Sequence, residues 1–425
     1  MLSCTRIGPR WSPRQPFSVT RRFCIKLICS AVSEPKVLAH FDEECADFLP
    51  WLERKARARI ASKLYIGKSA NGRALFASKR IRRGECILTI PFHAHLASEK
   101  LLPQAESLLG DEVGEQSKLA ILLMAEQKIG QRSEWAPYIN CLPRPGEMHS
   151  SIFWSETELD MIRQSSVYQE TFDEKALIQK DFMKIKPALE YFPELSESIT
   201  YNDYMHALAV DFVNHDGSSK AIVLNDDDEQ LTEVEADRSY APNEEVLISY
   251  GNFSNADLLL DFGFTLPYNV HDQVKIRMNI PHHDSLRAMK MEVLQDDHRR
   301  NIKDASGSED SADSFIINSE LSDLVMEATQ NDGRLARRPL KDKRRELQAH
   351  EILLSHITQL IEEYNASIKL LGPADDSPSF CNRFALRKQN ALNLLAGELR
   401  ILNSASAWLQ NYCATLLRQT SRLRS

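Results

Sequence analysis

Residues 245–264 read Glu-Val-Leu-Ile-Ser-Tyr-Gly-Asn-Phe-Ser-Asn-Ala-Asp-Leu-Leu-Leu-Asp-Phe-Gly-Phe. The apolar run Val246–Ile248 predicts a short buried strand. Gly251 follows one residue after Tyr250, and glycine reaches backbone angles that other residues avoid, so a turn should end the strand there. The stretch therefore predicts a strand that delivers Tyr250 to the mouth of a pocket.

A short helix should close behind that turn. Ser254 or Asn255 can cap its first turn with a side-chain oxygen, and the apolar residues continue through Leu260. Gly263 is placed to stop it, because helices commonly end on a left-handed glycine. The same pattern also fits an ordinary strand, turn and helix in any mixed domain, so the stretch alone does not decide a function.

Two earlier stretches give this one its meaning. Residues 211–216 read Asp-Phe-Val-Asn-His-Asp, and residues 71–81 read Asn-Gly-Arg-Ala-Leu-Phe-Ala-Ser-Lys-Arg-Ile. A further stretch, which reads Gly-Glu-Cys-Ile-Leu-Thr-Ile-Pro, follows at residues 84–91. Taken together and in this order, the stretches resemble the SET-domain protein methyltransferases. Their nearest likeness is to the Rubisco large-subunit lysine methyltransferases of plant chloroplasts and their relatives, over roughly residues 40–420.

The resemblance implies an α+β fold in three parts. Residues 1–33 would be a transit peptide, and residues 34–270 a β-rich SET domain interrupted by a helical insert at about 100–205. Residues 271–425 would form an all-α substrate-binding domain. The implied activity is methyl transfer from S-adenosylmethionine to a lysine of a protein substrate, with Rubisco large subunit or another stromal protein as the family-level expectation.

Tyr250 matches the active-site tyrosine of the resembled family. Its hydroxyl would lie beside the methyl group and hold the lone pair of the acceptor amine in line. An ordinary lysine has a pKa near ~10.4 and must first lose its proton, which a narrow apolar channel promotes because desolvation disfavours the ammonium. A core tyrosine with a satisfied hydroxyl is the alternative reading.

Asn71, Gly72 and Arg73 match the loop that binds the methionine part of the cofactor, where glycine lets the backbone approach closely. The family more often has glycine where this chain has Ala74, so one methyl group could crowd that approach. An ordinary turn would account for Gly72 equally well. The resemblance therefore assigns the three residues to the cofactor as a hypothesis.

Asn214 and His215 match the pair that binds the amine and the adenine of the cofactor, and Phe264 matches a residue that lies against the adenine. A structural histidine and core packing of the phenylalanine are the alternatives. Asp211 and Phe262 are assigned to the substrate. Relatives often have tyrosine where this chain has Phe262, and such exchanges can change how many methyl groups are added.

One departure from the family bears on activity. Relatives carry a Ser-Arg-Ala element before the Asp-x-x-Asn-His motif, and here residues 205–210 run straight into Asp211 without it. A catalytically impaired SET-like binding module is therefore the second hypothesis. A histidine-directed methyltransferase remains possible within the same architecture. A purely helical scaffold is disfavoured by the β-rich stretches 64–91 and 220–280.

The bulk composition restricts the class of protein. The chain has 425 residues with 43% hydrophobic and 26% charged residues, which is typical of a globular protein of two or three domains. A net charge of −8 argues against a general nucleic-acid binder. No stretch approaches the ~20 apolar residues that cross a bilayer. The eight cysteines form no C-x-x-C pair, and the acidic run 225–229 suits a hairpin turn better than a metal site.

Residues 1–33 contain basic and serine residues but no Asp or Glu, which is typical of an organelle transit peptide. The resemblance directs the expectation to the chloroplast stroma. A disordered basic tail and a mistaken start codon are the alternatives.

Periodicity predicts the remaining elements. Helices are expected at 40–62, 101–130 and 154–192, the last with a capping box at Ser155 and Glu158. Residues 135–145 should form a loop, and 296–314 a mobile one. Two long helices should fill the end of the chain, preceded by a basic cluster at 334–345 that either starts a helix or docks an acidic partner. Further strands are expected at 64–91, 221–224, 230–234 and 273–280.

Overall fold

The computed structural model describes most of the chain between residues 40 and 422. The described residues are 28–29, 40–57, 63–69, 72–96, 107, 109, 113–144, 146–192, 199–209, 213–214, 223–226, 230–247, 252–277, 314–318, 343–373 and 383–422. The chain divides into two compact units. Residues 1–21 and 275–317 form one unit, and residues 22–274 and 318–425 form the other.

The first sheet is a hairpin with one added strand. Strand β3 (Leu64–Ser69) pairs antiparallel with β4 (Gly72–Ala77), and β2 (His40–Phe41) lies on the other edge of β3. Side chains alternate between the faces of a strand, so the paired Ile66 and Leu75 are buried together against helix α1 (Phe48–Ala56). The predicted β-structure after residue 64 is confirmed.

The second sheet has the order β5-β8-β7, with β5 (Cys86–Pro91), β7 (Val223–Asp226) and β8 (Leu231–Glu235). Neighbouring strands are antiparallel, and β7 and β8 form the predicted hairpin. Two single β-bridges join Phe76 of β4 to Glu245 and Ile81 to Tyr240. They link the segment 240–245 to β4 and to the residues that follow β4.

The predicted strand at 246–248 is not a strand in its described part. Glu245 makes one bridge, and the Val246 amide donates to the Leu75 carbonyl at 2.8 Å, but no ladder continues through Leu247. Val246 is nevertheless buried, as its apolar side chain predicts. Residue 248 lies outside the described residues.

The helix predicted at residues 40–62 needs correction at its start. Helix was expected from residue 40, but β2 pairs with β3 there, and Asp42 caps a 3-10 turn at Glu43–Cys45. Helix α1 begins only at Phe48 and ends at Ala56, after which Arg57 adopts a left-handed conformation. Pro50 is tolerated because it stands in the first turn, where its missing N–H has no helical partner.

The expected loop at 135–145 contains a short helix, α4 (Ala136–Ile139), because Pro137 stands in its first turn and favours helix initiation there. Trp135 is fully buried just before it, 5.5 Å from the ring of Trp51 on α1. The Lys55 ammonium lies 4.1 Å from the centre of the Trp135 ring. These contacts fix α1 against the start of α4.

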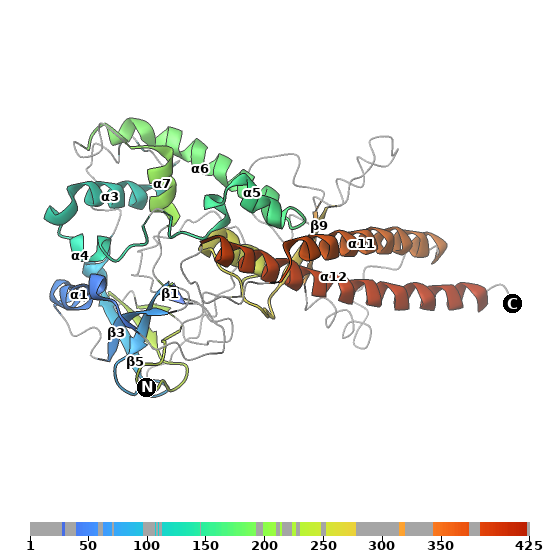
Figure 1. Ribbon diagram of the computed structural model, residues 1–425, viewed down its shortest axis with the longest axis horizontal. Coiled ribbons are helices and arrows are strands. Elements are labelled where there is room, and N and C mark those ends of the chain that lie inside the picture. The colour runs from blue at the N-terminus through green and yellow to red at the C-terminus, as the bar shows by residue number, and fades with distance from the viewer. Residues whose placement is uncertain are drawn as a thin grey trace. The chain divides into compact units, whose positions relative to one another are not determined.

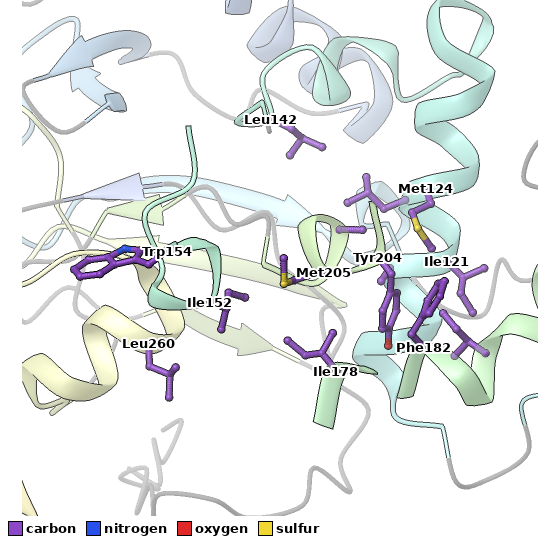
Figure 2. Packing of buried hydrophobic residues seen from close by; sticks show 14 of the residues in the cluster. Ile121, Met124, Leu142, Ile152, Trp154, Ile178, Phe182, Tyr204, Met205 and Leu260 are labelled. Atoms are coloured by element: carbon purple, nitrogen blue, oxygen red, sulfur yellow. The ribbon is translucent and has the colours of Figure 1, made fainter. Parts of the chain in front are cut away.

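A block of helices separates the two β-rich stretches. Helices α3 (Glu115–Ile129), α6 (Val167–Leu189) and α7 (Tyr201–Ala209) share one apolar core, and α3 is buried on most of its circumference. Figure 2 shows Phe182 of α6 beside Tyr204 of α7, with ring centres 5.7 Å apart. The Tyr204 hydroxyl donates to Ser117 at 2.8 Å, so the one polar atom of that ring is satisfied.

The capping box predicted for the next helix is present. Helix α5 (Glu156–Leu159) starts after Ser155, whose hydroxyl accepts from the Glu158 amide while the Glu158 carboxylate accepts from the Ser155 amide. A 3-10 turn at Asp160–Ile162 leads from α5 towards α6. The prediction of helix over 154–192 is therefore correct apart from these short interruptions.

The chain ends in two long helices that lie side by side in Figure 1, α11 (Lys343–Leu371) and α12 (Arg383–Arg422). Both long helices predicted for the end of the chain are confirmed, and apolar side chains such as Ile357 on α11 and Leu395 on α12 are buried. The Tyr364 hydroxyl on α11 donates to the Glu398 carboxylate on α12 at 3.0 Å.

Helix α12 also packs on the helical block. Arg387 is fully buried, and its guanidinium donates to Glu158 at 2.7 Å and to the carbonyls of Phe153 and Met148 at 3.0 and 2.8 Å. A buried guanidinium needs its charge paired and its N–H groups bonded, and here Glu158 pairs the charge while Nη1 and Nη2 are bonded; Nε has no hydrogen-bond partner among the described residues. The contact ties the C-terminal helices to the rest of their unit.

Short strands complete the description. Strand β1 (Ile28–Cys29) pairs in parallel with β6 (Val213–Asn214), so part of the predicted transit peptide lies in a described sheet. Strand β9 (Gln273–Arg277) pairs with β10 (Ser314–Asn318). Most of the predicted loop 296–314 and of the basic cluster 334–345 lies outside the described residues. Among the described helices, none is long and apolar enough to cross a membrane.

Candidate functional site

The structure describes five of the nine residues predicted for the site. Gly72 and Arg73 open β4, Asn214 ends β6, and Phe262 and Phe264 lie on either side of Gly263. The other four, Asn71, Asp211, His215 and Tyr250, lie outside the described residues. The site is therefore built here from two described clusters, one around Arg73 and one around Gly263.

The Arg73 side chain is held by the protein itself. Its Nε donates to the buried Asp42 carboxylate at 2.7 Å, and its Nη2 pairs with Glu44. Nη1 donates to the Cys141 carbonyl at 3.2 Å. Burial lowers the pKa of Arg73, but the bonded Asp42 carboxylate and the nearby acidic groups raise it above its ordinary value, so the charge is permanent. Only the backbone of this residue is left for the predicted cofactor contact.

Asp42 and Glu44 are partners of Arg73 that the sequence motifs did not single out. Both stand on the segment before α1, far from Arg73 in sequence, and no local pattern announces an ion pair over that separation. Arg144 pairs with the other oxygen of Glu44 at 3.1 Å. A cavity of about 370 Å³ opens beside this cluster, lined by Glu44, Ile139, Asn140, Leu142 and Arg144.

The second cluster depends on how the helix after Ser254 ends. Ser254 and Asp257 form a capping box, as the sequence predicted for a cap at this position, and the helix passes into a π-helical turn at Leu258–Phe262. Gly263 then adopts φ +82°, which favours glycine, and its amide donates to the Leu258 carbonyl at 2.9 Å. The predicted stop at Gly263 is confirmed, and the last helical residue is Phe262, two residues beyond the expected Leu260.

Gly263 is required by space as well as by φ. A Cβ built there would stand 2.3 Å from the Ser150 nitrogen and 2.5 Å from the His149 carbonyl carbon. The Ser150 hydroxyl donates to the Leu260 carbonyl at 2.5 Å and holds the two segments together. The loop 149–150 therefore sits directly on the backbone between Phe262 and Phe264.

The aromatic rings around Gly263 form a half-buried cluster. The ring centres of Phe253 and Phe262 are 5.8 Å apart, and those of Phe262 and Phe264 are 6.4 Å apart. These distances suit edge-to-face and offset contacts, in which each ring supports the next. The cluster supplies an apolar surface of the kind expected for a methyl-transfer channel or for an adenine.

Helix α12 reaches the same backbone from the other side. The Asn390 amide donates to the Gly263 carbonyl at 3.1 Å, and the Thr265 hydroxyl donates to the Asn390 side-chain oxygen at 3.1 Å. Sequence reasoning missed Asn390, because an asparagine on a long helix carries no signal for a partner so distant in the chain. The aromatic segment is thus held between the loop 149–150 and α12.

Two titratable groups near these clusters have displaced pKa values. Burial, followed by the charges of Arg387 and Arg383, lowers the pKa of His149 to about 4, so this histidine is neutral at pH 7. Its Nδ1 finds no hydrogen-bond partner among the described residues. Burial raises the pKa of Glu245, which starts the stretch leading to Tyr250, to about 7. No group of three or more possible metal ligands occurs in the described part of the chain.

Known proteins resemble this chain in sequence and in fold. The SET domain family model matches residues 72–251. The actin-histidine N-methyltransferases of Homo sapiens and Gallus gallus are each 25% identical over 298 residues, which is 60% of this chain and 48% of theirs. The chain therefore spans about half the length of the curated relatives it matches.

Solved structures match over a larger share of the chain. The structure of Rubisco LSMT bound to AdoMet has a TM-score of 0.63 at 18% identity, and covers 91% of this chain and 96% of its own. The SET domain of LSMT bound to lysine and AdoHcy has a TM-score of 0.65 at 17% identity, covering 90% and 95%. The predicted fold class is confirmed, and the plant chloroplast branch stays a prediction. The chain has a SET domain fold with a helical C-terminal region like that of Rubisco LSMT.

Proposed function

We propose that this chain is an S-adenosylmethionine-dependent protein N-methyltransferase. The observation that carries the proposal is the SET match over 72–251, which contains Gly72, Arg73, Asn214, His215 and Tyr250 in the family's order. The relatives found by sequence are named for methylating a protein, and the structural neighbours are named with AdoMet or AdoHcy bound. The described residues fit such a cofactor, since Gly72 carries no side chain and the phenylalanine cluster offers an apolar face for an adenine.

The bound cofactor would supply an activated methyl group, and the chain would position its acceptor. Phe262 and Phe264 would exclude water from the channel, which favours the neutral form of an acceptor amine. The Tyr250 hydroxyl would orient the nitrogen lone pair, and Asn214 with His215 would bind the cofactor's polar groups. Alignment of this kind accounts for much of the rate of a displacement reaction.

Two acceptors are in question, lysine and histidine. The motif resemblance and the LSMT neighbours favour lysine, whereas the relatives found by sequence are named for histidine. An ordinary imidazole has a pKa near ~6.5 and is mostly neutral at pH 7.5, whereas a lysine near ~10.4 is not. We therefore expect turnover to level off above pH 7 with a histidine acceptor and to keep rising towards pH 9 with a lysine acceptor.

Cofactor binding is the first test. Calorimetry would compare the wild-type chain with Asn214→Ala, and with Asn403→Ala as a matched control on the exposed side of α12, where the Asn403 amide donates to the Leu399 carbonyl of its own helix. We expect saturable binding that Asn214→Ala weakens at least about tenfold and Asn403→Ala leaves unchanged. If a folded wild-type chain binds no cofactor, the methyltransferase proposal is contradicted. The second hypothesis, a protein-binding module that lacks the Ser-Arg-Ala element, would then remain.

Methyl transfer is the second test. Purified actin and a stromal protein extract would be incubated with labelled cofactor, and modified residues would be mapped by mass spectrometry. Tyr250→Phe should lower kcat at least about tenfold while cofactor affinity stays the same, because the hydroxyl acts on the acceptor. Equal kcat values for the wild type and for Tyr250→Phe would show that the Tyr250 hydroxyl takes no part in methyl transfer.

Chloroplast import remains part of the proposal on the composition of residues 1–33 alone. Residues 1–33 fused to a fluorescent protein would be followed into isolated chloroplasts. Cleavage after residue 33 would also remove β1, the described partner of β6. If β1 belongs only to the leader, the chain 34–425 should bind the cofactor as tightly as the full chain does. Weaker binding by the shortened chain would mean that Ile28–Cys29 serve the folded domain.

A further inference from the structure

The peptide unit between Gly263 and Phe264 depends on outside contacts for its direction. Glycine has no Cβ, so its backbone angles are less restricted than those of other residues. The Gly263 carbonyl and the Phe264 amide lie in one planar unit, so the direction of that carbonyl also sets the direction in which Phe264 leaves the chain. The amides of Gly263 and Phe264 both donate to the Leu258 carbonyl, at 2.9 and 3.4 Å. The second bond is long, so the carbonyl side of the unit is the place where a further contact has most effect.

Asn390 of α12 supplies that contact. Its side-chain N–H donates to the Gly263 carbonyl at 3.1 Å, and its side-chain oxygen accepts from the Thr265 hydroxyl at 3.1 Å. A carbonyl can only accept, so the donor end of the amide must face Gly263, and the Thr265 hydroxyl serves the acceptor end. Asn390 and Thr265 are 4% and 7% exposed, so these bonds are shielded from water.

The same face of α12 also holds the loop 149–150. Arg387 stands one turn before Asn390, and its guanidinium donates to the carbonyls of Met148 and Phe153 at 2.8 and 3.0 Å. These two carbonyls flank the loop, which packs directly on the glycine between the two phenylalanines. Residues three apart on a helix are neighbours on its surface. One face of α12 therefore fixes both the loop and the peptide unit that the loop covers.

We propose that Asn390 is a positioning residue of the methyl-transfer site, which sets the direction of Phe264 by holding the Gly263 carbonyl. This inference rests on the proposed function, in which Phe264 lies against the adenine of the cofactor. It extends the site beyond the SET match at 72–251, because the residue that orients the adenine contact stands on the C-terminal helix α12. Asn390 acts through Phe264 and is not itself a catalytic residue.

Removal of the Asn390 side chain has a defined local effect. The Thr265 hydroxyl also lies 3.3 Å from the backbone carbonyl of residue 390, so it keeps a partner in Asn390→Ala. The Gly263 carbonyl loses its Asn390 donor, and the peptide unit before Phe264 gains rotational freedom. The ring must then be ordered when the adenine binds, and the entropy of this ordering weakens binding.

The first measurement needs no cofactor. Hydrogen exchange in the peptide 258–266 would be compared by mass spectrometry for the full-length wild type, Asn390→Ala and Asn403→Ala. We expect the Phe264 amide to exchange at least about fivefold faster in Asn390→Ala, because its bond to Leu258 depends on the fixed peptide unit. Asn403→Ala, on the exposed side of the same helix, should match the wild type. Equal exchange in all three chains would overturn the inference and leave the proposed function standing.

Cofactor binding then tests whether Asn390 acts through Phe264. Calorimetry with S-adenosylmethionine, below the melting temperature of every chain, would give Kd for the wild type, Asn390→Ala, Phe264→Ala and the double variant. We expect Asn390→Ala to raise Kd at least about fivefold. In the Phe264→Ala background the same substitution should change Kd by less than about twofold, because the ring through which it acts is gone. An equal weakening in both backgrounds would indicate a merely structural role and overturn the inference.

Asn390→Asp separates the donor from the shape of the side chain. An ionised aspartate keeps an acceptor for the Thr265 hydroxyl but has no N–H for the Gly263 carbonyl, so Kd should rise at least about fivefold here too. This variant replaces Asn390→Ala in the cycle if thermal melting shows that the alanine variant does not fold. Wild-type affinity in either folded variant would overturn the inference alone. A folded wild type that binds no cofactor would instead contradict the proposed function and the inference together.

Discussion

At the scale of single residues, Gly263 shows two separate demands on one position. Its φ of +82° favours glycine, and the backbone of His149 and Ser150 occupies the space where a Cβ would stand. The first demand could be predicted, since a glycine that ends a helix is commonly left-handed. The second could not, because it depends on a loop more than a hundred residues away.

Gly263→Ala should therefore destabilise the chain by more than its φ alone explains. We expect a loss of about 3 kcal/mol or more in the free energy of unfolding, measured by urea denaturation. Gly372→Ala is the matched control, since Gly372 also follows a helix with a positive φ of +68° but has nothing within 4 Å of its Cβ position. That control should lose only about 1 kcal/mol. Equal losses in the two variants would show that the close approach at Gly263 has no energetic weight.

Arg73 gives a second residue-scale prediction. Arg73→Ala leaves the buried Asp42 carboxylate without its main partner, which should cost about 3 kcal/mol of unfolding free energy. Arg144→Ala removes the exposed partner of the same Glu44 and should cost less than about 1 kcal/mol. Chemical denaturation of both variants decides the point, and similar small losses would mean that Asp42 is solvated in solution.

At the scale of elements, patterns within one segment were predicted well. The β7–β8 hairpin, the capping box of α5 and the two terminal helices follow from periodicity and capping signals. The errors lie where a partner outside the segment decides. Residues 40–41 form a strand because β3 offers an edge, and α4 forms where prolines suggested only a loop.

The candidate site divides in the same way. Of the residues that the motifs singled out, Gly72 opens a strand rather than lying in a loop, and the roles assigned to Asn214, Phe262 and Phe264 stay predictions. The contacts that hold them, from Asp42 and Asn390, join segments far apart in sequence, and such pairs leave no trace in local spacing. Contacts between segments so far apart in the sequence could not be predicted from the sequence of a single chain.

Helix α12 should stabilise the aromatic segment through Asn390. Asn390→Ala removes the donor to the Gly263 carbonyl and the acceptor for Thr265, both buried, and should cost about 1–3 kcal/mol. Asn403→Ala, on the exposed side of the same helix, should stay within about 0.5 kcal/mol. If the two variants unfold at the same denaturant concentration, α12 does not support this segment.

At the scale of the whole molecule, the buried acids set the pH dependence of stability. Burial, then the Asp272 carboxylate, raises the pKa of Glu398 to about 8, and burial raises that of Asp272 to about 6. Both pKa values lie above those of the unfolded chain, so their contribution is complete below about pH 4 and is lost as pH rises through the folded pKa values. The buried His149, with its pKa of about 4, no longer titrates above pH 7.

Glu398→Gln should therefore flatten the stability curve at alkaline pH. Between pH 6.5 and 8.5 we expect the wild type to lose unfolding free energy with a slope of up to about 1.4 kcal/mol per pH unit from this group, and the variant to lose less. Ser165 and Tyr364 donate to different oxygens of Glu398, so glutamine keeps an acceptor for one of them and turns its amide N–H towards the oxygen of the other. Urea denaturation across this range measures the difference, and parallel curves would show that Glu398 does not titrate there.

The packing of α1 on the start of α4 also gives the protein an intrinsic fluorescence signal that reports on this contact. Trp135 is fully buried with the Lys55 ammonium 4.1 Å from its ring centre, so its emission should be blue-shifted and partly quenched. Trp154, whose indole donates to the His149 carbonyl at 2.8 Å, lies instead beside the Gly263 contact. Detachment of α1 should brighten and red-shift the first signal, while loosening around Gly263 changes the second. Single-tryptophan variants would thus follow the two halves of the candidate site separately, by their intrinsic fluorescence.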